Sequence, residues 1–230
     1  MKNHAVNNER FYSFLRIVKV DQITGETVPQ KDVGFKVYDP NGKVVVYKDS
    51  DTWYSDEDGI VTLPFMLEYG EGYTVEEVTA PKGYLLPTER IAFDVLPETA
   101  QKIDDLNVIE LKAIDAPTQV DALKVDPYGI PVPGAKLQVL DKTGAVIDEW
   151  VSTEEAHRIY QLHIGETYVL HEKEAPEGYL PAEDVSFTIE DTAEVQIVRM
   201  EDELIPKLHT TAISKCSTVT TTIWTMSEPI

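Results

Sequence analysis

The sequence predicts an all-β protein made of two tandem β-sandwiches. Short segments rich in Val, Ile, Tyr and Phe, such as "FLRIVKV" and "IAFDV", are separated by turn dipeptides such as Asn41-Gly42 and Asp58-Gly59. No window of helical length has a convincing apolar face. The same series of segments then occurs again in the same order, which indicates a duplicated domain.

The opening strand of each copy contains the sequence Lys-Val-Asp, as "IVKVD" from Ile17 and as "ALKVD" from Ala122. The next segment, "VGFKVYDPNGKVV" from Val33, corresponds to "PGAKLQVLDKTGAVI" from Pro133. Near the end of each copy, "IAFDV" corresponds to "VSFTI". The first copy is longer around residues 47–73, where we expect an elaborated loop.

These matches define the expected domain organisation. We expect an N-terminal extension at 1–11, a first domain at 12–116 and a second domain at 117–204. The threonine-rich tail at 205–230 has no counterpart in the repeat, so we expect either the start of a further domain or a disordered end.

Another segment that returns in the second copy is "YTVEEVTAPKGY" from Tyr73, which matches "YVLHEKEAPEGY" from Tyr168. The shared Ala-Pro-x-Gly-Tyr ending is typical of a turn that leads into an aromatic plug, so we interpret it as scaffold. Each copy also carries a glutamate four residues after the first tyrosine, Glu77 and Glu172. Scaffolding alone does not explain a repeated acid within a strand.

Strand alternation places three charged residues of each copy on apolar faces. Each of these residues follows apolar residues at a spacing of two. In the first copy the faces are Leu15, Ile17 and Lys19; Tyr73, Val75 and Glu77; and Ile109, Leu111, Ala113 and Asp115. In the second they are Val120, Ala122 and Lys124; Tyr168, Leu170 and Glu172; and Val198, Met200 and Asp202.

A lysine and two carboxylates inside a β-sandwich have a specific chemical capability. Burial lowers the pKa of lysine and raises that of a carboxylate, so the pair tends toward neutral amine and neutral acid. A neutral amine can attack a carboxyl carbon, while a protonated glutamate polarises the carbonyl and transfers protons. The product is an intramolecular Lys–Asp isopeptide bond, and water is the leaving group.

In both copies a strand ending "KVD" precedes the pattern Y-x-[VL]-x-E-x-x-A-P-x-G-Y, and in the second copy "MEDE" follows it. This pattern resembles the Cna B-type or SpaA-type (prealbumin-like) domain of Gram-positive surface proteins and pilins. The resemblance covers both copies and is closer in the second. It implies a transthyretin-like, reverse-Ig-like β-sandwich, in which a first-strand lysine is bonded to a last-strand Asn or Asp beside a catalytic glutamate.

Carried over by position, the resemblance implies two sets of site residues. The isopeptide lysines are Lys19 and Lys124, the catalytic residues Glu77 and Glu172, and the acceptors Asp115 and Asp202. Many family members have asparagine at the acceptor position and release ammonia. In the first copy Asp105 and Asn107 remain alternative acceptors. We expect the neighbouring acids Glu76 and Glu174 to point the other way by alternation or to lie in the turn.

The resemblance implies a structural stalk or backbone module of a cell-wall or pilus protein involved in adhesion. Each bond would form once by autocatalysis, so we do not expect an enzyme. One alternative is an adhesin module that binds a host extracellular ligand through an aromatic patch around Trp53, Tyr54 and Tyr73. Another is a carbohydrate-binding β-sandwich without isopeptide bonds, which requires a groove of coplanar aromatic side chains.

The composition excludes several classes of partner. Forty-one acidic and twenty basic residues produce a formal charge of −21, so we expect neither nucleic-acid binding nor contact with an anionic membrane. The single cysteine, Cys216, rules out an internal disulfide framework. We expect no cofactor.

We also expect no metal. "DSDTWYSDEDG" does not match the spacing of an EF-hand calcium loop, and His157, His163 and His171 lack a zinc-binding pattern.

By resemblance we expect an extracellular location, with neighbouring domains of a longer surface protein as partners. The sequence shows neither a signal peptide nor an LPxTG-type sorting motif. We therefore expect an interior or truncated piece of such a protein.

Overall fold

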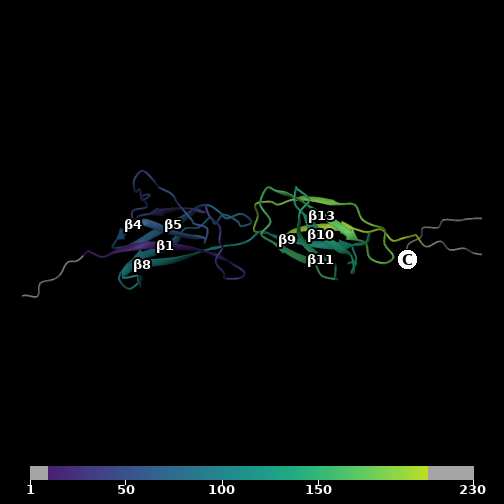
Figure 1. Ribbon diagram of the computed structural model, residues 1–230, viewed down its shortest axis with the longest axis horizontal. Coiled ribbons are helices and arrows are strands. Elements are labelled where there is room, and N and C mark those ends of the chain that lie inside the picture. Colours follow the sequence, from purple (N-terminus) through teal and green to yellow (C-terminus); the bar gives the residue numbers. More distant parts are fainter. Residues whose placement is uncertain (1–9, 207–230) are drawn as a thin grey trace, which may run out of the picture. The chain divides into compact units, whose positions relative to one another are not determined.

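The computed structural model describes residues 10–206, and this part of the chain contains β-strands without helices. Most of the extension at 1–11, most of the tail at 205–230 and Cys216 lie outside the described residues. The strands are β1 (Tyr12–Asp21), β2 (Gly34–Tyr38), β3 (Trp53–Tyr54), β4 (Ile60–Glu68), β5 (Gly70–Thr79), β6 (Ile91–Val95), β7 (Gln101–Ile103), β8 (Leu106–Asp115), β9 (Gln119–Val125), β10 (Lys136–Leu140), β11 (Val146–Val151), β12 (His157–Tyr160), β13 (Thr167–Glu174), β14 (Val185–Thr188) and β15 (Gln196–Glu201) (Figure 1). The all-β class is confirmed.

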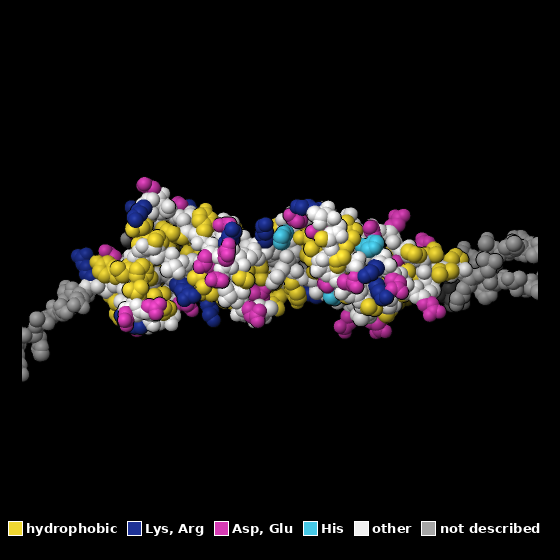
Figure 2. Space-filling model, viewed as in Figure 1, with side chains coloured by type: hydrophobic (Ala, Val, Ile, Leu, Met, Phe, Trp, Pro, Cys, Tyr) yellow, Lys and Arg dark blue, Asp and Glu magenta, His cyan; other side chains and the backbone are white. Residues whose placement is uncertain are grey.

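The chain divides into two compact units. The first runs to Val120 and also contains Arg158–Thr167 and Thr188–Gln196. The second contains Asp121–His157, Tyr168–Phe187 and the described residues 197–206. Acidic side chains are spread over the visible faces of both units and are not gathered into one patch (Figure 2).

The first unit contains a sandwich of two four-stranded sheets, ordered β4-β1-β8-β7 and β3-β2-β5-β6. Within the first sheet β1 pairs antiparallel with β4 and parallel with β8. The first and last long strands of the repeat are therefore neighbours. Alternate residues of β1 and β2, among them Leu15, Ile17, Phe35 and Val37, are fully buried in the core between the sheets.

The expected loop at residues 47–73 is largely strand, because it contains β3, β4 and the start of β5. Val61, Leu63 and Leu67 of β4 are buried against the core, which gives this segment an inward face. Pro64 interrupts its hydrophobic pattern. It lies in an edge strand where the register with β1 shifts, and a proline without an N–H is tolerated at such a position.

The second repeat has a similar strand arrangement, but one of its two sheets has three strands in place of four. One sheet is ordered β11-β10-β13-β14, and β9 lies between β12 and β15 in a three-stranded sheet. Leu137, Val139, Leu170 and Met200 are fully buried, as the two-residue period of their strands requires. None of the described residues forms a helix long and apolar enough to cross a membrane.

Candidate functional site

Lys19, Glu77 and Asp115 meet in the interior of the first sandwich. Nζ of Lys19 lies 2.6 Å from Oε2 of Glu77 and 2.5 Å from Oδ1 of Asp115. All three residues are buried, Lys19 and Asp115 completely. A buried lysine is rare unless it is paired, and here it is paired with two acids.

The pairing of β1 with β8 explains how Lys19 reaches Asp115. In this parallel register Lys19 is opposite Ala113 and Asp21 is opposite Asp115. Asp115 therefore lies two residues further along β8 on the same face of the sheet as Lys19. The first and last strands of the domain thus place amine and carboxyl group side by side.

Glu77 approaches from the opposite sheet, where a β-bulge follows it. Gly34 pairs with Thr79 and Phe35 with Glu77, so Val78 is left without a partner. Bulges re-aim side chains, and they occur frequently next to active sites. Nζ of Lys19 also lies 5.6 Å from the centre of the Phe35 ring, so the residue opposite Glu77 forms part of the apolar wall.

Lys124, Glu172 and Asp202 form an equivalent cluster in the second unit. Nζ of Lys124 lies 2.5 Å from Oδ1 of Asp202 and 2.9 Å from Oε1 of Glu172. The side chains of all three residues are fully buried. The structure therefore brings together both sets of sequence-derived residues.

The second cluster has the same bulge as the first. Lys136 pairs with Glu174 and Leu137 with Glu172, so Lys173 is left unpaired. Both glutamates thus immediately precede a bulged residue. Strand alternation does not predict these bulges. The similarity of the two repeats around each glutamate is the sequence signal that the two backbones have the same local conformation there.

Burial dominates the electrostatics of both clusters. It raises the pKa of Glu77 to about 8, against the opposing effect of the nearby Lys19 ammonium. Burial also raises the pKa of Asp115 and that of Asp202, although each lies beside a lysine. Carboxyl groups in these clusters therefore hold protons at pH values where exposed ones are ionised.

The alternative residues considered from the sequence lie elsewhere. The Nδ2 amide of Asn107 donates to the carbonyl of Tyr12, and Asp105 is exposed in the turn before β8. Glu76 accepts hydrogen bonds from Tyr38 and Arg90 on the other face of β5.

The aromatic patch considered for an adhesin is not formed as expected. Trp53 and Tyr73 are buried in the core, and of the three aromatic residues only Tyr54 is exposed. Among the described residues no group of three or more His, Cys, Asp or Glu side chains could hold a metal ion. His157 and His171 instead contact Asp148 and Asp184, each at 2.7 Å.

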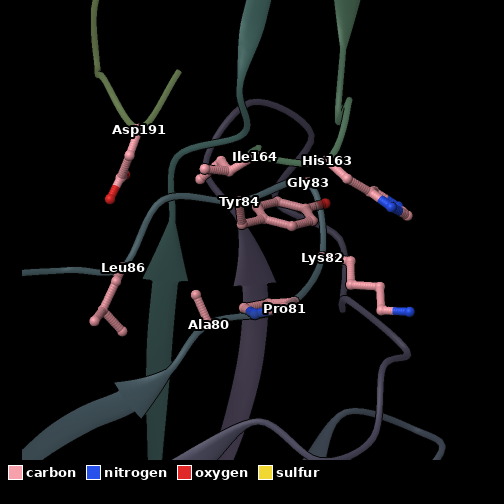
Figure 3. A pocket seen from close by; sticks show the side chains of 9 residues that line it. All are labelled: Ala80, Pro81, Lys82, Gly83, Tyr84, Leu86, His163, Ile164 and Asp191. Carbon is pink, nitrogen blue, oxygen red and sulfur yellow. The ribbon is translucent and has the colours of Figure 1, made fainter. Parts of the chain in front are cut away.

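A pocket of about 230 Å³ in the first unit is lined by the Ala80–Tyr84 turn together with Leu86, His163, Ile164 and Asp191 (Figure 3). Gly83 approaches the backbone of Gln161 so closely that a Cβ there would lie 2.4 Å from its carbonyl oxygen. Tyr84 donates from its hydroxyl to Asp21. The turn is therefore a packing element, as its sequence indicates.

Comparison with known proteins identifies the fold family. The family model described as SpaA, prealbumin-like fold domain, matches residues 14–108 and 118–204. None of the curated proteins matches the sequence.

Among solved structures, the Bacillus anthracis TIE protein is 25% identical with a TM-score of 0.55, and the match covers 84% of this chain and 34% of that chain. The chain thus spans about a third of that protein's length. The C-terminal fragment of pilus adhesin SpaC from Lactobacillus rhamnosus GG is 14% identical with a TM-score of 0.44, covering 87% of this chain and 100% of that one. Shaft pilin SpaA from Lactobacillus rhamnosus GG is 13% identical with a TM-score of 0.39, covering 87% and 100% respectively.

Proposed function

Because the chain belongs to the SpaA prealbumin-like fold domain family, with two such domains in tandem, we propose that it is a stalk or backbone module stiffened by two intramolecular Lys–Asp isopeptide bonds. Family membership supports a structural role in a Gram-positive pilus or surface protein. We propose Lys19 and Asp115 as the bonded pair of the first domain and Lys124 and Asp202 as that of the second. Glu77 and Glu172 are the proposed catalytic residues.

The observation that carries this proposal is the contact of one buried lysine with two buried acids, present in both domains. Ion pairs alone are a poor explanation for such clusters. Burying charges costs several kcal/mol per ion, and apolar residues of the same size often stabilise a core equally well. If both acids around one lysine were ionised, one negative charge would also be left without a partner. Amide formation removes the charges of both bonded residues.

The reaction balances within each cluster. When a proton has passed from the lysine ammonium to a carboxylate, the neutral Nζ attacks Cγ of the aspartic acid. A C–N bond forms and a C–O bond breaks, while the protonated glutamate hydrogen-bonds to the carbonyl oxygen and assists proton transfer to the departing hydroxyl. One water leaves for each bond. The reaction occurs once per domain, so the chain is not an enzyme in the sense of turnover.

The position of the bonds suits a load-bearing module. Each bond joins the first strand of a domain to its last strand, so force applied at the domain ends acts on a covalent link before the sheets separate. We further propose that the chain lies outside the cell and adjoins other domains of a longer surface protein. The buried positions of Trp53 and Tyr73 weaken the case for an aromatic ligand surface.

The mass of the intact folded protein tests this proposal. We expect a mass lower than the sequence mass by two waters, and proteolysis should yield two branched peptides, one containing Lys19 with Asp115 and one containing Lys124 with Asp202. A mass equal to the sequence mass would refute the proposed crosslinks. A loss of one water would restrict them to a single domain, which the branched peptide would identify.

A further inference from the structure

The Ala-Pro-x-Gly-Tyr turn has the same local structure in both repeats. In the first, the main-chain N–H of Thr118 donates to the carbonyl of Gly83, and in the second that of Ile205 donates to the carbonyl of Gly178. The tyrosine of each turn forms a β-bridge with the residue that precedes this donor. Each turn therefore lies against the chain that leaves the last strand of its domain.

The two turns differ in their exposure to solvent. In the first repeat the proline, glycine and tyrosine of the turn are all buried, whereas in the second the proline and tyrosine are half-buried and the glycine is exposed. Thr118 is 1% exposed and its equivalent Ile205 is 48% exposed. Because the local structure is the same, the difference comes from what packs on each turn.

A loop at residues 161–164, which belongs to the first unit, covers the turn of the first repeat. The main-chain N–H of Gln161 donates to the carbonyl of Thr118, and the hydroxyl of Thr118 donates to the carbonyl of Leu162. The side-chain amide of Gln161 donates to the hydroxyl of Tyr84 at 2.7 Å and to Oδ2 of Asp21 at 3.2 Å. The loop is thus held by both main-chain and side-chain hydrogen bonds.

Gly83 allows this loop to approach the turn closely. The carbonyl oxygen of Gln161 would lie 2.4 Å from a Cβ at Gly83, and Ile164 of the same loop lies beside the turn (Figure 3). Gly178 has a similar positive φ angle, yet no atom of the described residues lies within 4 Å of a Cβ placed there. The turn of the second repeat therefore has room for a covering loop.

The uncovered end of the second repeat is also apolar. Five large apolar side chains at this end are between 40% and 70% exposed, and we call them the distal surface. They are Tyr128 and Ile130 after β9, Leu180 after the repeated turn, and Leu204 and Ile205 after β15. The main-chain N–H of Asp202 donates to the carbonyl of Val125, so the ends of β9 and β15 lie side by side. Gathered apolar side chains of this kind mark interaction sites.

The distal surface also has the acid to which the covering loop binds in the first repeat. Oδ1 of Asp21 accepts N–H groups of its own turn, and Oδ2 accepts the amide of Gln161. Asp126 is the equivalent residue, and its Oδ1 likewise accepts the N–H groups of Tyr128 and Ile130. Its Oδ2 is therefore in the place of the oxygen that receives the loop.

The covering loop is itself a repeated element. "HIGETY" from His163 corresponds to "EYGEGY" from Glu68, so Gln161 and Ile164 correspond to Met66 and Tyr69. Met66 and Tyr69 are 50% and 60% exposed. In each repeat this loop precedes a strand, β5 or β13, and the Ala-Pro-x-Gly-Tyr turn follows the same strand. Loop and turn thus lie at opposite ends of a domain, an arrangement that suits head-to-tail contact between domains.

We propose that the distal surface binds the corresponding loop of a further prealbumin-like domain that follows the second repeat in the chain. This inference rests on the longer surface protein proposed above and is independent of the isopeptide bonds. In the bound state a carbonyl oxygen of the loop faces Gly178, and a polar side chain donates to Oδ2 of Asp126. Binding removes the apolar side chains from water and fixes the orientation of the following domain, which suits a stiff stalk.

The test adds such a domain to the full-length chain. A further copy of residues 119–205 is inserted after Ile205, which reproduces the spacing between turn and loop and holds the added domain at high effective concentration. Cys216→Ser removes the native thiol, and Ile205→Cys in the original copy places a thiol on the distal surface. With the insert, this thiol should react with iodoacetamide at least about tenfold more slowly than without it, because it becomes buried as Thr118 is.

Two controls separate binding from the mere presence of an added domain. Val146→Cys, at the other end of β11 and 50% exposed, should react equally fast with and without the insert. Gly178→Ala should restore fast reaction of the Ile205→Cys thiol, because its Cβ occupies the place of the loop carbonyl. Gly144→Ala has the same backbone strain at φ 81° but lies away from the distal surface, so it should preserve the slow reaction.

Equal reaction rates of the Ile205→Cys thiol with and without the insert would overturn the inference. Slow reaction in the chain without the insert would also overturn it, because the distal surface would then be covered already. If the extended chain does not fold, residues 14–118, whose loop contains Met66 and Tyr69, replace the insert and the same outcomes decide. The intact mass of the same samples reports the isopeptide bonds, so a failure of crosslinking is distinguished from a failure of binding.

Discussion

Nζ of Lys124 lies 2.5 Å from Oδ1 of Asp202, a residue 78 positions later in the chain. A covalent bond at this contact would close almost the whole second domain into a loop. By the loop-closure model used for disulfides, a closed loop of this length contributes about 4.5 kcal/mol by restricting the unfolded chain. The contribution is large compared with the total stability of about 5–15 kcal/mol of a typical domain.

Replacing either lysine should affect one domain only. Lys124→Ala should have an intact mass only one water below the mass calculated from its own sequence, because one bond remains, and Lys19→Ala should show the same for the other domain. Each variant should lower the melting temperature of its own domain by on the order of 20 °C, since about 4.5 kcal/mol is lost from a domain of this size. Calorimetry and limited proteolysis measure this loss. Lys136→Ala, which removes an exposed lysine paired with Glu174, is the control and should preserve both bonds.

Asparagine should replace aspartate as the acceptor. Asp202→Asn presents the same carbonyl carbon to Lys124 but releases ammonia in place of water, so the bonded product is chemically identical to that of the unmodified protein. The intact mass of fully bonded Asp202→Asn should therefore equal that of the fully bonded unmodified protein. Asp202→Ala should leave Lys124 free to react with amine reagents after unfolding. Failure of Asp202→Asn to bond, in a protein that is otherwise folded, would contradict the role of Asp202 as acceptor.

The first domain should lose stability with rising pH when its bond cannot form. In Lys19→Met the burial that raises the pKa of Glu77 persists, and the ammonium that opposes it is gone. The folded state then binds a proton at Glu77 that the unfolded state releases above about pH 4.5. Its contribution to stability is complete below that pH and is lost as pH rises toward and beyond about 8.

The free energy of unfolding of Lys19→Met, measured with urea, should thus be lower at pH 8 than at pH 5 by on the order of a few kcal/mol. The double variant Lys19→Met with Glu77→Gln should show a smaller dependence on pH. Equal profiles for the two variants would contradict the assignment of the proton to Glu77.

The two glycines of the repeated turn should differ in their tolerance of alanine. Gly83 and Gly178 have positive φ angles of 83° and 93°, so alanine at either position incurs a backbone cost of about 1–2 kcal/mol. A Cβ at Gly83 would also lie 2.4 Å from the carbonyl oxygen of Gln161, whereas a Cβ at Gly178 meets nothing within 4 Å. Gly83→Ala should therefore lower the free energy of unfolding by at least about 2 kcal/mol more than Gly178→Ala does. Equal costs in chemical denaturation would show that the Gln161 contact is unimportant.

Strand alternation was sufficient to identify the interior charges. Lys19, Glu77 and Asp115 each follow apolar residues at a spacing of two, and the structure places all three in the core. The spacing succeeds because the side chains of a strand alternate between its faces whatever its partners are. Duplication strengthened the prediction, because the same acid occurs at the same place in both repeats.

The segment at residues 47–73 shows where local patterns failed. The extra length of the first copy predicts an elaborated loop there, yet β4 forms because Val61, Leu63 and Leu67 complete the core beside β1. An edge strand tolerates a proline at a bulge, and whether a segment lies at an edge depends on the other strands of its sheet. Tertiary packing therefore overrides the local signal.

The sequence by itself determined the β class, the duplication and the inward lysine and acids, because these depend on a two-residue period and on repetition along the chain. Only the tertiary structure decided that β8 lies parallel to β1 with Asp115 two residues beyond the partner of Lys19, and that a bulge follows each glutamate. It alone also revealed that the main-chain N–H of Ala182 donates to Glu172 from a segment outside the repeat's strands. Register and hydrogen bonding between distant segments depend on how the sheets pair and pack, and no local pattern encodes that.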